Sequence, residues 1–210
     1  MTFYTEGLQE FYDSGASRLF QEIEQRVNRQ AIAPLFRPRV RRWGRILDIG
    51  CGNGHLAGEL GVRRACFLDL SWERVKVCRQ RIGAGSFAQA DLFRLPFREG
   101  TFDGVICSNV LHYTGLEGFH ELLRVTKKGG QMLLAFLEES GFTRALIDMN
   151  IALGLFPPVM REARLLNLSH VRQCDVGCKD SATISFFPPL FRVSRGWPLQ
   201  GLVAMELERY

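Results

Sequence analysis

The sequence lacks the apolar segments that membrane insertion or secretion requires. No uninterrupted apolar run approaches the roughly 20 residues of a membrane-spanning helix, because Asp148 and Asn150 interrupt the most apolar late stretch. The first residues, MTFYTEGLQEFYD, are acidic and polar, without the basic start and apolar core of a secretory signal. We therefore expect a cytoplasmic protein.

The six cysteines also lack the spacing of a metal centre or a redox pair. None belongs to a C-x-x-C pair. Cys174 and Cys178 are close in sequence, but their spacing does not suit zinc and no paired histidines supply further ligands. We expect no metal site, and the cysteines are interpreted as small buried residues.

The charge is uneven: the formal net charge is +5, and it comes largely from arginine. The densest group surrounds Trp43 and comprises Arg37, Arg39, Arg41, Arg42 and Arg45. Such a group would suit an anionic partner, including nucleic acid. The alternative, a solvated positive face on the connector into the first strand, is favoured because no nucleic-acid-binding module surrounds the group.

A chain of 210 residues, 46% of them hydrophobic, is long enough for one domain with a full core. We expect one domain over residues 1–210: an N-terminal helical lid or connector at 1–44, a cofactor-binding core at 45–137 and a divergent C-terminal part at 138–210. Apolar residues at three- and four-residue steps predict a leading helix over residues 14–35, which Pro38 and Gly44 then interrupt.

From residue 45 onward, short β-type runs alternate with helical stretches. Strands are predicted at 45–50, 65–70, 86–92, 103–108 and 131–137, with helices at 71–82 and 116–125 and a turn at 127–130. Strands separated by helices imply right-handed crossovers and a parallel sheet. The later chain predicts a helix from Gly141 to about Leu155, a break at Pro157, and β-type runs that end in GLVAMELERY.

Glycines and acidic residues follow the first two predicted strands. The segment Asp48 to Gly54 (DIGCGNG) ends a strand and opens a helix, where an α/β sheet presents backbone N–H groups to a ligand. The dinucleotide pattern G-x-G-x-x-G would need glycine at position 55, which is His55. Asp69 suits hydrogen bonds from ribose hydroxyls, which nicotinamide dinucleotides and S-adenosylmethionine share.

Five ordered segments resemble the class I S-adenosylmethionine-dependent methyltransferases, particularly small-molecule enzymes with the LDIGCGNG motif. They are LDIGCGNG (47–54), FLDLS (67–71), ADLFRLPF (90–97), FDGVICSNVLHY (102–113) and ELLRVTKKGGQMLLAF (121–136). At 127–130 the sequence has KKGG where this family more often has KPGG. The expected fold is α/β and Rossmann-like, a doubly wound, mainly parallel sheet with an antiparallel C-terminal strand.

The resemblance implies a set of cofactor contacts. S-adenosylmethionine is the implied cofactor, and its methionine part would be held by Asp48, Gly50, Cys51 and Gly52. Asp69 would hold the ribose, and the backbone near Ser108 would lie beside the sulfonium. The adenine would be contacted by three further residues, the ring by Leu70, the amino group by Asp91 and the ring edge by the Leu92 backbone.

The fourth segment also contains the candidate catalytic residues, His112 and Tyr113. The sulfonium methyl group is already activated, so a base is needed only where the acceptor must lose a proton. His112, at the mouth of the fourth strand, would be that base, with an acid limb near its ordinary pKa of about 6.5. Tyr113 would orient the acceptor. The alternative is that His112 lines the pocket without taking a proton.

Aromatic residues outside these segments favour a small apolar or aromatic acceptor. Four precede the leading helix, as a lid or as core packing, and four lie in the divergent part: Phe3, Tyr4, Phe11, Tyr12, Phe156, Phe186, Phe187 and Phe191.

The alternatives are an RNA or other nucleic-acid methyltransferase, a noncatalytic S-adenosylmethionine-binding module and, weakest, a nicotinamide-dependent reductase. Against nucleic acid, the fourth segment has Ser-Asn-Val-Leu (108–111) where base-amine methyltransferases have Asn/Asp-Pro-Pro-Tyr.

Overall fold

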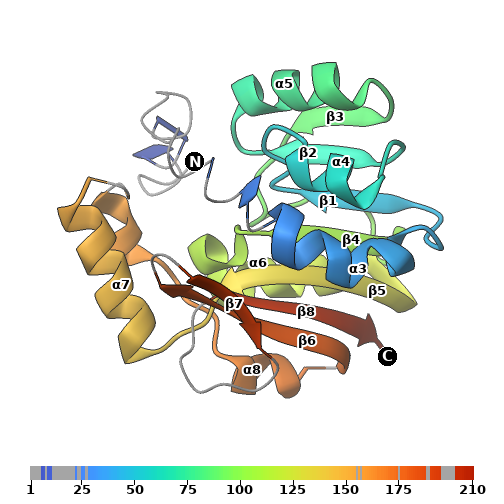
Figure 1. The fold of residues 1–210 in the computed structure, drawn as a ribbon. Coiled ribbons are helices and arrows are strands. Elements are labelled where there is room, and N and C mark those ends of the chain that lie inside the picture. Colours follow the sequence, from blue (N-terminus) through green and yellow to red (C-terminus); the bar gives the residue numbers. More distant parts are fainter. Residues whose placement is uncertain are drawn as a thin grey trace.

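One mixed β-sheet organises the described part of the chain. The computed structural model describes Glu6, Gly7, Gln9, Glu10, Glu22, Gln25, Arg26 and residues 28–154, 156, 158–174, 176–187, 190–194 and 202–210. Within these residues eight strands form a single sheet in the order β3-β2-β1-β4-β5-β8-β6-β7 (Figure 1). Among them, no helix combines the length and the apolar character needed to cross a bilayer.

Five strands run parallel and three C-terminal strands complete the sheet. The parallel strands are β1 (Ile46–Ile49), β2 (Cys66–Asp69), β3 (Ser86–Gln89), β4 (Phe102–Ser108) and β5 (Thr126–Leu137). β8 (Leu202–Arg209) pairs antiparallel with β5, and β6 (Val176–Phe187) then pairs antiparallel with both β8 and β7 (Leu190–Ser194). The expected doubly wound, mainly parallel sheet with an antiparallel C-terminal strand is therefore confirmed.

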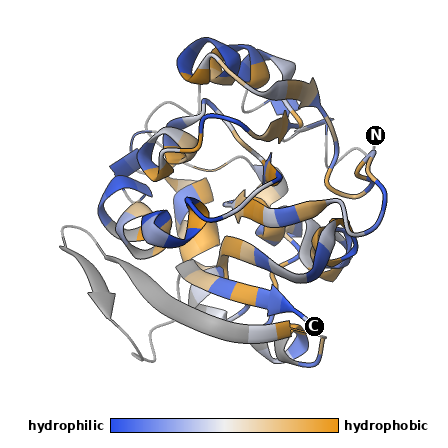
Figure 2. Cartoon of the chain, turned by 90° about the vertical axis from the view of Figure 1, so that its right-hand side faces the viewer, coloured by the Kyte–Doolittle hydropathy of each residue, from blue (hydrophilic) through white to orange (hydrophobic). Residues whose placement is uncertain are grey.

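Helices cover both faces of this sheet. They are the π-helix η1 (Asn28–Ile32), α3 (Ala33–Val40), α4 (His55–Leu60), α5 (Trp72–Ile82), α6 (Leu111–Val125), α7 (Gly141–Ala152), the 3-10 helix η2 (Pro158–Glu162) and α8 (Leu168–Arg172). Because successive strand residues point to opposite faces, Ile106 packs with Phe36 of α3 and Leu60 of α4, whereas Val105 packs with Phe119 of α6. Apolar residues accordingly recur along the strands inside the molecule (Figure 2).

Two local predictions need correction, and a third lies partly outside the described residues. Pro38 lies inside α3 instead of ending the leading helix, because Phe36 and Val40 on either side of it are buried in the core and hold the turn. The expected turn at 127–130 belongs to β5, where a register shift opposite Phe102 and Gly104 absorbs the glycines. Of the predicted helix at 14–35, residues 14–21, 23, 24 and 27 lie outside the described residues.

The helix after β4 begins earlier than the predicted residue 116. It starts at Leu111, and a kink at Gly115, with φ 59° and ψ −143°, joins a first turn to the expected helix. A β-carbon at Gly115 would lie 2.9 Å from the Arg164 carbonyl oxygen, so only glycine allows the chain to pass there. This first turn carries His112 and Tyr113.

Candidate functional site

A cleft lies beyond the carboxyl ends of β1 and β4. Chain connections from β1 lead to one side of the sheet and those from β4 to the other, and open α/β sheets bind ligands at such a reversal. The cleft is lined by Gln25, Asn28, Asp48, Gly50, Cys51, Gly52, Asn53, His55, Leu56, Arg74 and Ser108. Five of the nine proposed cofactor-binding residues are therefore brought together here: Asp48, Gly50, Cys51, Gly52 and Ser108.

The glycine loop approaches the cleft so closely that two of its positions require glycine. Gly50 has φ +70°, its N–H donates to the Leu68 carbonyl at 2.7 Å, and a β-carbon there would collide with Val110 Cγ2. Gly52 has φ +52°, also in the left-handed region. Residues other than glycine rarely adopt this left-handed conformation. Because glycine has no side chain to fill the cleft, the backbone of the loop is exposed to it at these two positions.

Asp69 at the end of β2 fixes this loop to the next helix. Its Oδ2 accepts a hydrogen bond from the Gly52 N–H at 2.8 Å, and its Oδ1 accepts one from the Ser71 N–H at 2.9 Å. Ser71 in turn caps α5 by accepting from the Arg74 N–H at 3.2 Å. The carboxylate is buried, and it positions the loop in addition to the ribose contact predicted for it.

Asp48 lies fully inside the protein beneath the cleft. Burial, together with the negative charge of nearby Asp69, raises the pKa of its carboxyl group to about 7. A carboxyl group in this condition is poised to accept a positive charge, because a cation beside it would restore the ionised form. The site is therefore suited to a cationic ligand group.

Two buried oxygens in the cleft find no hydrogen-bond partner among the described residues. They are Oδ1 of Asn28 on η1 and Oγ of Ser108 at the end of β4. Buried polar groups in proteins are almost always paired, so such atoms at one cleft indicate a place for a polar ligand. Sequence reasoning missed Asn28, Arg74 and Gln25, which precede or follow the motif segments without a motif of their own.

The residues predicted to contact adenine follow β2 and β3 at the same sheet edge, but they do not line the cleft. The Gln89 side chain donates to the Leu70 carbonyl at 2.7 Å, which ties the ends of these two strands together. Asp91 Oδ1 accepts from the Phe93 N–H at 3.0 Å and so also closes the turn after β3. Leu92 is buried in the core against α6.

Residues 47–134 match the family model described as a methyltransferase domain. Over this segment the chain is similar to the class I methyltransferase family. The cofactor of this family is S-adenosylmethionine, and the glycine loop, the acidic strand ends and the unpaired cleft oxygens fit a ligand that carries an ammonium group, ribose hydroxyls and a sulfonium.

Relatives of this methyltransferase family differ in what their names say they methylate. A tRNA (carboxymethyluridine(34)-5-O)-methyltransferase of Arabidopsis thaliana is 37% identical over 97 residues, 42% of this chain and 23% of the relative. A ubiquinone/menaquinone biosynthesis C-methyltransferase of Pseudomonas fluorescens is 35% identical over 126 residues, 52% of this chain and 47% of the relative. The chain thus spans less than half of either relative.

The fold of the family extends over nearly the whole chain. A solved S-adenosylmethionine-dependent methyltransferase of Thermotoga maritima covers 92% of this chain and 98% of its own, with a TM-score of 0.63 and 18% identity. At that identity the likeness establishes the fold alone. The arrangement of the strands and helices therefore matches the fold of that solved structure.

The candidate catalytic pair lies deeper than expected. His112 and Tyr113 occupy the first turn of α6, not the end of β4, and His112 is 2% exposed. Their ring centroids are 4.2 Å apart, and His112 Nδ1 has no partner among the described residues. Burial lowers the pKa of His112 to about 3, so an acid limb near pH 6.5 is no longer expected from it.

Residues 41–45 of the arginine group lead into the amino end of β1, at the opposite edge of the sheet from the cleft (Figure 1), whereas Arg37 and Arg39 lie on α3. Arg37 donates to the Glu59 carbonyl at 2.6 Å, and Arg39 pairs with Glu206 at 2.7 Å. The Trp43 indole donates to Gln131 at 2.6 Å. This connector is anchored to the fold, and only some of its arginines face outward.

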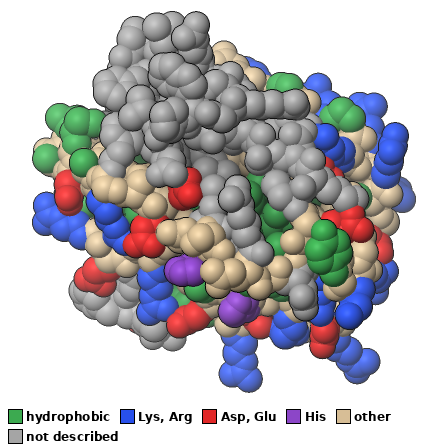
Figure 3. Space-filling view, turned by 90° about the horizontal axis from the view of Figure 1, so that it is seen from below, with side chains coloured by type: hydrophobic (Ala, Val, Ile, Leu, Met, Phe, Trp, Pro, Cys, Tyr) green, Lys and Arg blue, Asp and Glu red, His purple; other side chains and the backbone are tan. Residues whose placement is uncertain are grey.

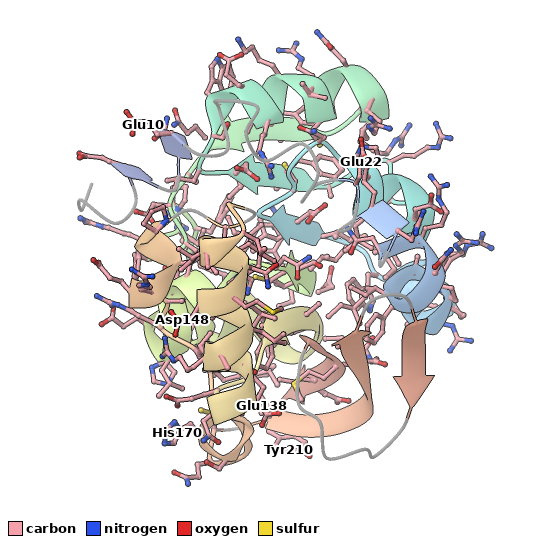
Figure 4. The ribbon with its side chains drawn as sticks, turned by 60° about the vertical axis from the view of Figure 1, so that its left-hand side comes forward. Glu10, Glu22, Glu138, Asp148, His170 and Tyr210 are labelled. Carbon is pink, nitrogen blue, oxygen red and sulfur yellow. The ribbon has the colours of Figure 1, made fainter. Side chains whose placement is uncertain are left out.

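Charged residues elsewhere in the described part of the chain do not form a second centre. On the face seen from below, Lys and Arg side chains alternate with Asp and Glu (Figure 3). Glu138, Asp148 and His170 stand apart on the C-terminal elements (Figure 4). Within the described ranges, no group of three His, Cys, Asp or Glu side chains could hold a metal ion.

Proposed function

We propose that the chain transfers the methyl group of S-adenosylmethionine to a small apolar or aromatic acceptor. The observation that carries the proposal is the cleft at the carboxyl edge, where the glycine-containing loop meets a buried carboxyl group and two oxygens without a partner among the described residues. When bound, the cofactor supplies an electrophilic methyl group. The residues of the chain bind and align the reactants and exclude water.

Each proposed cofactor contact follows from what its residue offers. Asp48 and the loop of Gly50, Cys51 and Gly52 would hold the methionine part. Asp69 would accept hydrogen bonds from the ribose hydroxyls, because each carboxylate oxygen can accept more than one. Leu70, Asp91 and Leu92 would contact the adenine, and the backbone at Ser108 would lie by the sulfonium.

In this proposal the rate enhancement comes mainly from alignment. Holding donor and acceptor in line can contribute on the order of 7–11 kcal/mol. His112 is neutral at physiological pH but, with its pKa near 3, is too weakly basic to carry a demanding proton transfer. We therefore assign it, with Tyr113, to orienting the acceptor rather than to general-base catalysis.

An apolar cluster beside α6 supports the proposed class of acceptor. Tyr113 packs with Ile147 of α7 and Met160 of η2, and the half-buried Phe156 joins them. The side chains of Phe186, Phe187 and Phe191, and all of Phe3, Tyr4, Phe11 and Tyr12, lie outside the described residues. An acceptor that extends from the sulfonium position toward this cluster would meet apolar walls.

A nucleic-acid acceptor is the second candidate, favoured by the name of the Arabidopsis relative and by the net charge. The position of Arg41, Arg42 and Arg45 speaks against a role in presenting such a substrate, because they lead into the amino end of β1 and the cleft lies at the carboxyl end. A noncatalytic cofactor-binding module would keep the cleft and lose turnover, so it is separated from an enzyme by methyl transfer, not by binding.

The first test is calorimetric titration with S-adenosylmethionine, S-adenosylhomocysteine and NAD, followed by a screen of small aromatic acceptors for methyl transfer. Asp69→Asn is expected to weaken binding of S-adenosylhomocysteine by about 1.5–3 kcal/mol, as for hydrogen bonds to a charged group. The matched control is Asp103→Asn, because Asp103 also accepts a backbone hydrogen bond, from the Arg45 N–H at 2.7 Å, at the far edge.

The control variant should bind S-adenosylhomocysteine like the wild type. Binding of NAD without either adenosyl ligand would overturn the proposed function. A folded Asp69→Asn protein with unchanged affinity would reject the ribose contact alone. Cofactor binding without transfer to any acceptor would favour the noncatalytic module.

A further inference from the structure

The amide oxygen of Asn28 is buried in the cleft under conditions that the fold alone does not explain. The residue is 5% exposed, it lines the cleft together with Asp48 and Ser108, and its Oδ1 has no hydrogen-bond partner among the described residues. Leaving a buried acceptor unpaired costs about 1–3 kcal/mol. A polar ligand in the cleft would recover this free energy.

The position of Asn28 is set by well-packed neighbours. It opens the π-helix η1, whose last residue Ile32 is buried in the core against α4. Arg29, the next residue, pairs with Glu59 of α4 at 2.9 Å. π-Helical turns recur at functional sites, where the widened turn redirects a side chain. The amide oxygen is thus held in the cleft by its helix.

The chemistry of the cleft identifies the group that Asn28 would bind. An amide oxygen only accepts hydrogen bonds, so its ligand must be a donor. Asp48 adds a buried carboxyl group to the same cleft, which favours a donor that carries positive charge. Arg74 lines the cleft as well and offers a cation for the negative end of an amino-acid ligand. A primary ammonium group satisfies both Asn28 and Asp48.

We propose that Asn28 Oδ1 accepts a hydrogen bond from the ammonium group of the cofactor's methionine part, in the cleft that it shares with Asp48. This assignment rests on the proposed function and adds a binding residue outside the glycine loop. It makes Asn28 a residue that selects adenosyl ligands with an amino group over those without one.

The experiment pairs a side-chain change with a ligand change. Asn28→Leu keeps the approximate volume and removes the oxygen, and Gln30→Leu makes the same kind of change at an exposed amide of the same π-helix. Each protein is titrated with S-adenosylhomocysteine and with its desamino analogue, S-adenosyl-4-mercaptobutyric acid. Thermal melts without ligand measure the stability of each variant.

Asn28→Leu should weaken S-adenosylhomocysteine about 10- to 100-fold, as for a hydrogen bond to a charged group, and change the affinity for the desamino analogue less than about twofold. The ligand-free variant should melt at or above the wild-type temperature, because an unpaired buried oxygen is gone. Gln30→Leu should bind both ligands like the wild type.

Equal losses for the two ligands would overturn the proposal and leave Asn28 as a wall of the cleft. Unchanged affinity for S-adenosylhomocysteine would overturn it as well. A wild-type protein that binds neither ligand would overturn the proposed function and this assignment together. The first two outcomes leave the proposed function in place, so the failures are distinguishable. If Asn28→Leu does not fold, Asn28→Ala replaces it with the same expected difference between ligands.

Discussion

At the scale of single residues, the carboxyl groups of Asp48, which lines the cleft, and of nearby Asp69 repel each other when both are ionised. Asp48 and Asp69 end adjacent strands, both are buried, and Asp69 already serves two backbone N–H groups. Asp48 is therefore the residue whose protonation we expect to respond to a cationic ligand. Its motif position can be recognised from sequence, but its burial and its carboxylate neighbour come from the pairing of β1 with β2.

This coupling predicts a pH dependence of cofactor binding. The pKa of Asp48 is about 7 in the ligand-free protein, so below pH 7 the group is largely protonated and a cationic ligand must displace the proton. Affinity for S-adenosylhomocysteine should therefore rise with pH, by at most about tenfold per unit below pH 7, and level off above it. Titrations at pH 6 and pH 8 in buffers of different ionisation enthalpy would measure the proton release directly.

Asp48→Asn is the control for this prediction. The variant should bind more weakly at pH 8 and lose the pH dependence between pH 6 and pH 8. Proton release of zero at pH 6 in the wild type would show that Asp48 does not face the cationic end of the ligand.

Residue chemistry also limits what sequence could say about His112. Its type and its place after β4 suggested a base, but the kink at Gly115 turns the preceding segment into a buried helical turn. The pKa of about 3 is a consequence of that burial. Whether a histidine is exposed to solvent depends on how the helices pack on the sheet. This packing cannot be inferred from the residue type.

At the scale of elements, one glycine whose position requires glycine and another whose position would accept a side chain lie only eight residues apart. Gly50 has φ +70° and faces Val110, whereas Gly58 lies exposed inside α4 with no heavy atom near its missing β-carbon. Gly58→Ala should raise the free energy of unfolding by about 0.5–1 kcal/mol through helix propensity. Gly50→Ala should lower it by about 1–3 kcal/mol and weaken cofactor binding.

Urea unfolding of the two variants, with S-adenosylhomocysteine titrations on each, checks this pair. Gly58→Ala should leave ligand affinity unchanged. If Gly50→Ala proved as stable as the wild type, the loop would not need its left-handed conformation.

Elements determined by their own local sequence could be predicted, whereas elements determined by contacts with residues far along the chain could not. The apolar runs at β1, β2 and β4 and the Ser71 cap of α5 were all found from sequence. The start of α6 was missed because the Gly115 kink depends on Arg164, nearly fifty residues away. The continuation of α3 through Pro38 was missed because core packing by Phe36 outweighs one missing backbone donor.

At the scale of the whole molecule, the strand order gives the sheet two edges with different chemistry. The carboxyl edge gathers Asn28, Asp48 and Ser108 from separate parts of the chain, and the amino edge carries Arg41, Arg42 and Arg45. Sequence motifs predicted the first gathering, since parallel strands end on one side. The position of η1 beside the cleft and the order of β8, β6 and β7 depend on contacts between residues far apart in the sequence. Local sequence patterns do not reveal such contacts.

This separation of edges leads to a prediction about the outward arginines. Arg41 and Arg42 are exposed after α3, on the side of the sheet away from the cleft. Charge reversal by Arg41→Glu with Arg42→Glu should reduce retention on single-stranded RNA at low salt, and the slope of the salt dependence should fall by about 0.7 for each phosphate that the protein no longer neutralises. Affinity for S-adenosylhomocysteine and methyl transfer to a small acceptor should stay unchanged, because charges beyond a Debye length of about 8 Å are screened.

The matched control reverses Arg144 and Arg161 on the C-terminal elements, so that total charge changes equally at another place. A variant at Arg41 and Arg42 that loses methyl transfer in proportion to its RNA retention, while the control keeps both, would instead identify a nucleic-acid acceptor held at the amino edge.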